Sequence, residues 1–172
     1  MKNLKVCSIG YGRLGKMYAK YSLDFGAKVF VYDPFVTIKN KQINEINNLK
    51  KNLKKFDIIS INIHATKKNL NFFNKKIFKL LNKNVILINT SRGEIVNEVD
   101  LINFLKKNKK AKYYADVVSN EQSGIKDNII INEFKKKSNQ ILITPHIGGM
   151  TSDGQNLAYN HALNMLVGFH KK

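Results

Sequence analysis

The chain has 172 residues, 43% of them hydrophobic, which is enough for one domain with a substantial buried core. Its apolar runs are strand-sized and its first residues show no signal-peptide pattern, so we expect a cytoplasmic protein without a membrane partner. Thirty Lys and Arg residues against 12 Asp and Glu give a formal charge of +18. One interpretation is a basic face that binds nucleic acid. The interpretation we favour is a composition skewed toward Lys, Asn and Ile with no nucleic-acid partner, because the lysines are scattered and lack interleaved aromatics.

Short apolar runs alternate with segments of helical periodicity along the whole chain. The runs are continuous rather than alternating, as expected for parallel strands covered by helices. The pattern predicts an α/β fold with a doubly wound parallel sheet in a single domain, residues 1–172. The stretch 120–137 is predicted as the longest loop, with room for one helical turn. The predicted strands are Leu4–Ile9, Lys28–Tyr32, Asp57–Ile63, Val85–Asn89, Tyr113–Val118 and Ile141–Thr144, and the predicted helices are Leu14–Phe25, Ile46–Leu53, Asn74–Leu81, Val99–Lys107 and Ser152–Phe169.

A glycine-rich segment joins the first predicted strand to the first predicted helix. Its GxGxxG spacing, in that context, predicts a Rossmann-type dinucleotide site in which a helix N-terminus faces the phosphates. Asp33 ends the second strand, where a carboxylate would bind both hydroxyls of the adenine ribose and repel a 2′-phosphate. We therefore expect the cofactor to be NAD rather than NADP. The segment consists of Gly10, Tyr11, Gly12, Arg13, Leu14 and Gly15.

Arginine is rare in this chain, since Arg13 and Arg92 are the only two among 30 basic residues. Arg grips a carboxylate with two parallel hydrogen bonds, which Lys cannot do. Arg92 therefore indicates a carboxylate clamp, and together with the dinucleotide loop it predicts redox chemistry on a small organic acid. One cysteine, Cys7, and four scattered histidines supply no metal site, and Cys7 is expected to be a small buried hydrophobe.

Five motifs in one order resemble the cofactor-binding domain of the D-isomer-specific 2-hydroxyacid dehydrogenases, and within that family the phosphoglycerate enzymes. The motifs are the glycine loop at 10–15, Tyr-Asp-Pro at 32–34, Asn-Thr-Ser-Arg-Gly-Glu at 89–94, Ala-Asp-Val at 115–117 and Thr-Pro-His-Ile-Gly-Gly at 144–149. The resemblance implies a catalytic set of Arg92, Glu121 and His146. Arg92 would bind the substrate carboxylate and polarise the keto oxygen, His146 would exchange a proton with that oxygen, and Glu121 would orient the imidazole.

The resemblance also implies the cofactor contacts. The glycine loop would hold the pyrophosphate, and Asp116 would face the nicotinamide carboxamide. His64 replaces a proline of the family pattern, so we expect it to line the cofactor or form a turn rather than to act in catalysis. The remaining expected contacts are Asn69, Asn89, Thr90, Ser91, Gly148 and Gly149.

The resemblance implies a substrate domain of about one hundred residues before the glycine loop. This chain shows no such domain, because its first predicted strand begins at Leu4. The chain is then either a fragment of a longer protein or a naturally short gene product. The resemblance implies a small 2-keto or 2-hydroxy acid as substrate and a homodimer formed through the cofactor domain. The alternative is a non-catalytic NAD(H)-binding module that senses the cofactor and works through a partner.

Overall fold

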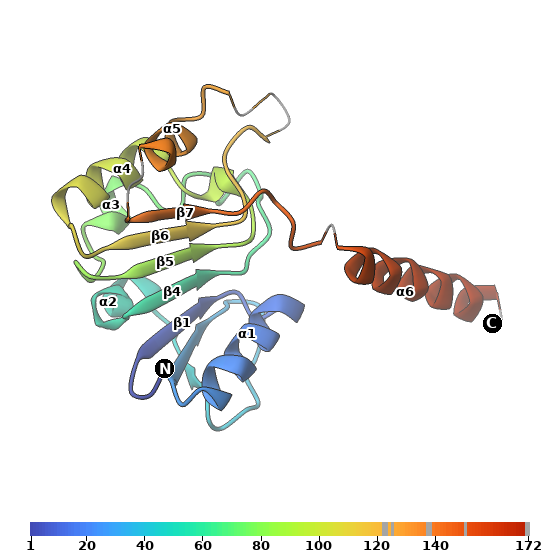
Figure 1. The fold of residues 1–172 in the computed structure, drawn as a ribbon. Helices are drawn as coiled ribbons and strands as arrows, with labels where there is room; N and C mark the ends of the chain where they lie inside the picture. The colour runs from blue at the N-terminus through green and yellow to red at the C-terminus, as the bar shows by residue number, and fades with distance from the viewer. Residues whose placement is uncertain (122–123, 125, 137–138, 150, 171–172) are drawn as a thin grey trace.

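The computed structural model describes residues 1–121, 124, 126–136, 139–149 and 151–170. Seven parallel strands form one sheet in the order β3-β2-β1-β4-β5-β6-β7 (Figure 1). The chain starts at the inner strand β1, adds β2 and β3 on one side of it, and then returns to build the rest of the sheet from β4 on the other side. This confirms the predicted doubly wound sheet. The strands are β1 Lys5–Ile9, β2 Lys28–Tyr32, β3 Asn44–Glu45, β4 Ile58–Ile61, β5 Ile86–Asn89, β6 Lys112–Ala115 and β7 Ile141–Ile143.

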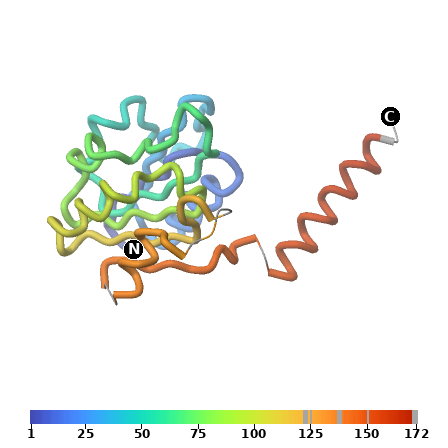
Figure 2. Tube along the Cα trace, turned by 90° about the horizontal axis from the view of Figure 1, so that it is seen from above, coloured from blue at the N-terminus to red at the C-terminus, as the bar shows by residue number. Residues whose placement is uncertain are grey.

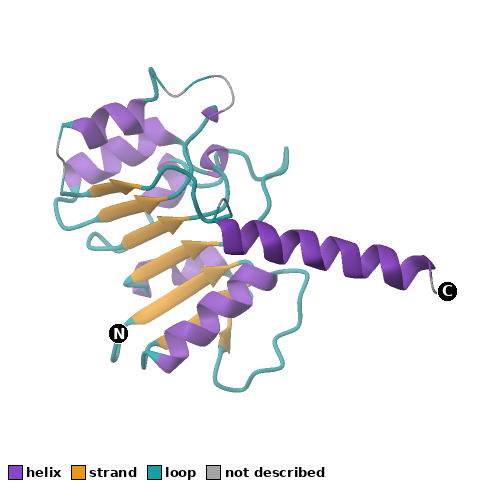
Figure 3. Ribbon diagram, turned by 45° about the vertical axis from the view of Figure 1, so that its right-hand side comes forward, coloured by secondary structure: helices purple, strands orange, loops and turns teal. Residues whose placement is uncertain are grey.

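Side chains of the central strands alternate between two apolar layers. Val6 and Ile58 face the layer that contains α1, whereas Cys7 and Ile59 face the larger layer that contains the other helices packed on the sheet. Figure 3 shows helices on both sides of the strands. Burial raises the pKa of the Cys7 thiol, and the side chain is fully buried, as expected for a small hydrophobe.

Four of the many asparagines cap helices, because asparagine is a strong helix N-cap. The side-chain oxygens of Asn48, Asn74, Asn97 and Asn128 accept backbone N–H groups at the starts of α2, α3, α4 and α5. The helices are α1 Arg13–Asp24, α2 Leu49–Asn52, α3 Lys75–Phe78, α4 Glu98–Lys107, α5 Ile129–Lys135 and α6 Ser152–His170, with short 3₁₀ turns η1 Leu53–Lys55 and η2 Gly93–Ile95.

The predicted helices Ile46–Leu53 and Asn74–Leu81 are shorter in the structure, at Leu49–Asn52 and Lys75–Phe78, and two further elements were not predicted. The predicted loop 120–137 contains the seven-residue helix α5, because Asn128 caps it and Ile130 is fully buried in the core. The strand β3 was not predicted, because its two residues are polar and carry no apolar pattern; they pair with β2, and the Asn44 side chain also donates to the Val29 carbonyl at 3.1 Å. Positions 122, 123, 125 and 137 of the predicted loop lie outside the described residues.

Helix α6 projects away from the sheet and its helices (Figure 2). Its residues from Ser152 to Phe169 are exposed apart from Gly154, and they include large apolar side chains such as Leu157 and Leu166. Within the described part of the chain, no helix is long and apolar enough to cross a membrane.

Candidate active site

The carboxyl ends of the parallel strands meet at one edge of the sheet, where ligands bind in open α/β folds. Most of the predicted site residues lie in or near the loops that leave this edge. The glycine loop follows β1, Asp33 follows β2, the segment 90–92 follows β5, Asp116 follows β6, and the segment 144–149 follows β7. The fold therefore brings together segments that are far apart in the sequence.

The three glycines of the first loop have different roles. Gly10 has φ +96°, and a Cβ there would lie 2.4 Å from the carbonyl oxygen of Asn62. A Cβ on Gly15 would lie 2.2 Å from the Gly10 carbonyl oxygen. Backbone atoms therefore leave no space for a side chain at Gly10 or at Gly15. Gly12 has no atom within 4 Å of an added Cβ, and it stands at the N-terminus of α1 without a side-chain cap. The chain itself does not need a glycine at this position, which fits a cradle for a phosphate group.

Asp33 ties the glycine loop to the end of β2. Its two oxygens accept the backbone N–H of Tyr11 at 2.8 Å and of Phe35 at 2.9 Å. The residue lines a hollow of about 270 Å³ beside Pro34 and Ile46. A carboxylate has about four lone-pair positions, so two remain for the hydroxyls of a ligand.

Asn89 supports the following loop from inside the protein. It is fully buried, donates to the Arg92 carbonyl at 3.0 Å and to the Tyr113 hydroxyl at 3.3 Å, and accepts the Ser91 N–H at 3.1 Å. Its side-chain amide is therefore fully engaged inside the protein, and a contact of Asn89 with the cofactor stays a prediction. The Ser91 hydroxyl donates to the carbonyl of Ile63.

Asp116 organises the segment after β7. Its carboxylate accepts the Thr144 hydroxyl and the backbone N–H groups of Ile147, at 3.1 Å, and Gly148, at 2.9 Å. Partial burial raises the pKa of Asp116, but these hydrogen bonds outweigh it and hold the pKa below its ordinary value. In this structure the charge of Asp116 shapes the loop that carries His146.

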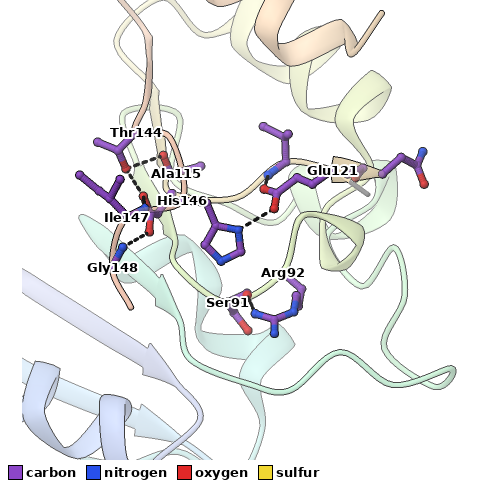
Figure 4. A network of polar contacts seen from close by, with 12 residues as sticks. Ser91, Arg92, Ala115, Glu121, Thr144, His146, Ile147 and Gly148 are labelled. Atoms are coloured by element: carbon purple, nitrogen blue, oxygen red, sulfur yellow. Dashed lines mark hydrogen bonds and ion pairs between the residues drawn. The ribbon is translucent and has the colours of Figure 1, made fainter. Parts of the chain in front are cut away.

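The three predicted catalytic residues line one pocket of about 540 Å³. The imidazole Nδ1 of His146 lies 2.6 Å from one Glu121 oxygen, and the other oxygen accepts the Val118 N–H at 2.6 Å (Figure 4). His146 has φ +54°, an uncommon backbone conformation for a residue other than glycine. Because Nδ1 is engaged by Glu121, Nε2 remains as the nitrogen that can exchange a proton with a ligand. The Arg92 guanidinium donates to the Ser91 carbonyl at 2.8 Å and is otherwise exposed in the same pocket.

The remaining predicted contacts are placed less directly. Asn69 donates to the His64 carbonyl at 2.7 Å and accepts the Thr66 N–H at 2.7 Å, so it fixes the loop after β4. The side chain of His64 is exposed, and so is Thr90. Gly148 and Gly149 are exposed at the same edge of the sheet.

The pocket also contains two charged residues that were not predicted from the sequence, Lys67 and Glu94. Neither stands in a pattern that marks it, although Glu94 directly follows the Ser-Arg-Gly motif. Among the described residues, no group of three or more His, Cys, Asp or Glu side chains could hold a metal ion.

Known proteins resemble this chain over most of its length. Residues 1–148 match the family model described as "D-isomer specific 2-hydroxyacid dehydrogenase, NAD binding domain". A D-lactate dehydrogenase of Staphylococcus aureus is 30% identical over 180 residues, which is 96% of this chain and 54% of that protein. The chain thus spans about half the length of the curated relatives it matches. The expected closeness to phosphoglycerate dehydrogenases is not shown.

Solved structures show the same fold. D-lactate dehydrogenase of Lactobacillus jensenii with NAD⁺ has a TM-score of 0.74 at 28% identity over 84% of this chain and 46% of that one. D-2-hydroxyisocaproate dehydrogenase has a TM-score of 0.86 at 23% identity over 97% of this chain and 53% of that one, a likeness of fold alone. From the family match, the strand order and the loops at the carboxyl edge, the chain belongs to the D-isomer specific 2-hydroxyacid dehydrogenase family, as its NAD-binding domain.

Proposed function

We propose that this chain is the NAD-binding and catalytic-residue half of an NAD-dependent 2-hydroxyacid dehydrogenase. The observation that carries the proposal is the convergence of Arg92, Glu121 and His146 on one pocket, with the His146–Glu121 pair at 2.6 Å. The relatives support the reaction class, since they are D-lactate dehydrogenases, one of them solved with NAD⁺. The Thr-Pro-His-Ile-Gly-Gly motif at 144–149 gives weaker support for a phosphoglycerate-type substrate.

The residues present fit the cofactor. The open space at Gly12 and the free N-terminus of α1 would take the pyrophosphate, and Asp33 would bind the adenine ribose. NAD⁺ or NADH supplies the hydride acceptor or donor. Arg92 would bind the substrate carboxylate through its planar fork and orient the keto carbon.

The geometry of the imidazole indicates how the proton is transferred. During reduction of a keto acid, Nε2 of His146 donates a proton to the substrate oxygen as the carbon gains a hydride, and during oxidation Nε2 takes that proton back. Glu121 holds Nδ1 and thereby fixes the ring, which leaves Nε2 for the substrate. The positive charge of Arg92 stabilises the negative charge that develops on the oxygen.

The cofactor preference gives a direct test. The Asp33 carboxylate would repel a 2′-phosphate, so titration calorimetry should show tighter binding of NADH than of NADPH. Asp33→Ala should narrow the difference, because it removes the repulsion. Equal or tighter binding of NADPH by the unchanged chain would contradict the proposal.

A second candidate function is a non-catalytic NAD(H)-binding module that acts through a partner. The observation that favours it is the openness of the pocket, where the His146 side chain is 47% exposed and water is not excluded. We expect the chain alone to show little or no oxidation of NADH with pyruvate, glyoxylate or phosphohydroxypyruvate. Turnover that appears only after a separately made substrate domain is added would favour the enzyme, and its absence would favour the module.

A further inference from the structure

The loop that carries Glu121 rests on three carboxylates. Three consecutive backbone N–H groups each donate to a different glutamate: Val118 to Glu121 at 2.6 Å, Ser119 to Glu98 at 2.8 Å, and Asn120 to Glu94 at 3.1 Å. We call residues 118–121 the catalytic loop. Asn120 has φ +59°, so the chain turns sharply just before Glu121. The position of Glu121 is therefore set by residues that follow Arg92 in the sequence.

Gly93 lies directly against the backbone of the catalytic loop. A Cβ on Gly93 would lie 2.0 Å from the carbonyl carbon of Val118 and 2.2 Å from the nitrogen of Ser119. Both atoms are backbone, so no side-chain movement could relieve the contact. The segment 92–98 thus presents Arg92 to the pocket on one side and holds the catalytic loop on the other.

Glu98 contacts the catalytic loop and the cap of α5 at the same time. One oxygen accepts the Ser119 N–H, and the other accepts Nδ2 of Asn128 at 2.9 Å. Asn128 cannot reverse its amide, because its Oδ1 caps α5 by accepting the N–H groups of Ile130 and Ile131. Its Nδ2 also donates to the Ser119 carbonyl at 3.1 Å. Position 98 therefore needs two acceptors, which a carboxylate supplies and an amide does not.

We propose that Glu98 is a positioning residue that fixes the Glu121–His146 pair by holding the catalytic loop against Asn128 and the start of α5. The inference deepens the proposed function, since it assigns the device that aligns its proton-transfer residue. Glu98 does not line the pocket and acts through the loop. Burial raises the pKa of Glu98, and its hydrogen bonds with Ser119 and Asn128 offset part of that rise.

The test uses the chain as it is and needs no catalytic activity. Proton NMR of the histidine ring N–H groups reports the short Nδ1–H···O hydrogen bond of His146 as a strongly deshielded proton resonance. Glu98→Gln should weaken or remove that signal, because the new amide NH₂ faces the NH₂ of Asn128. Glu94→Gln should leave it nearly intact, because a glutamine oxygen can still accept the single Asn120 N–H. Asp24→Asn, an exposed change at the end of α1, serves as the charge-matched control.

A double substitution separates positioning from general loss of structure. Asn128→Asp alone places two carboxylates together and should also weaken the signal. Glu98→Gln combined with Asn128→Asp restores one donor and one acceptor, so the double variant should recover part of the signal and show less than additive loss of stability. A signal unchanged in Glu98→Gln, or purely additive losses, would overturn the inference. Failure of the unchanged chain to bind NADH would contradict the proposed function and leave the outcome at Glu98 intact.

Discussion

Gly12→Ala should separate cofactor binding from folding. The added Cβ has no atom within 4 Å, and the backbone at φ −69° and ψ −163° is open to any residue. Replacing glycine at a compatible position stabilises by about 0.4–1 kcal/mol through the unfolded chain, and the poorer N-cap that alanine makes costs about 0.5–1 kcal/mol. The free energy of unfolding should therefore change by less than about 1 kcal/mol. The affinity for NADH should fall by about tenfold or more, equivalent to about 1.4 kcal/mol, because the methyl occupies the approach of the pyrophosphate.

The neighbouring glycines give the contrast. In Gly15→Ala the new Cβ would lie 2.2 Å from the Gly10 carbonyl oxygen, and in Gly10→Ala the strain of φ +96° is added to a contact of 2.4 Å. Overpacking of this kind costs about 1–3 kcal/mol, so both variants should unfold at lower urea concentration. Urea unfolding followed by circular dichroism measures stability, and NADH fluorescence measures affinity. Gly168→Ala in α6, where a Cβ also meets nothing within 4 Å, is the control for both. If Gly12→Ala binds NADH as tightly as the unchanged chain, the pyrophosphate does not lie against Gly12.

Three further predictions concern catalysis, acid stability and assembly. In an enzyme completed with a substrate domain, Arg92→Lys should raise KM and lower kcat while NAD affinity stays constant, and His146→Gln should nearly abolish turnover; normal turnover in His146→Gln would exclude its role. Asp116 has a lowered pKa in the folded chain, so its stabilisation should be complete above its ordinary pKa of about 4 and be lost as the pH falls below it. Asp116→Asn should flatten that part of the stability profile in acid titration, and an unchanged profile would argue against it. We propose a homodimer that strengthens as salt screens the charge of +18, to be followed by sedimentation; a strict monomer at every salt concentration would contradict it.

Local sequence patterns were enough to predict the architecture of the sheet. Continuous apolar runs separated by helical periodicity predicted the strands of the parallel sheet, and six of them lie where the pattern put them, within a few residues. The glycine spacing predicted a strand, a tight turn and a helix because each of these depends on neighbouring residues. Arg92 was marked by composition alone, since arginine is rare in this lysine-rich chain.

Other features depended on long-range contacts that no local pattern encodes. Nothing within the sequence around Glu121 distinguishes it from an exposed loop residue, and only a resemblance pointed to it; folding places it 2.6 Å from His146, 25 positions later. Asn89 was expected at the cofactor, and the structure adds that it is buried, with an amide that serves three partners around the loop it supports. Glu98 escaped notice because its partners, Ser119 and Asn128, lie 21 and 30 positions away. Hydrophobic periodicity fixes which face of an element is buried, whereas the partner of a polar side chain is decided only when distant loops meet at the same edge of the sheet.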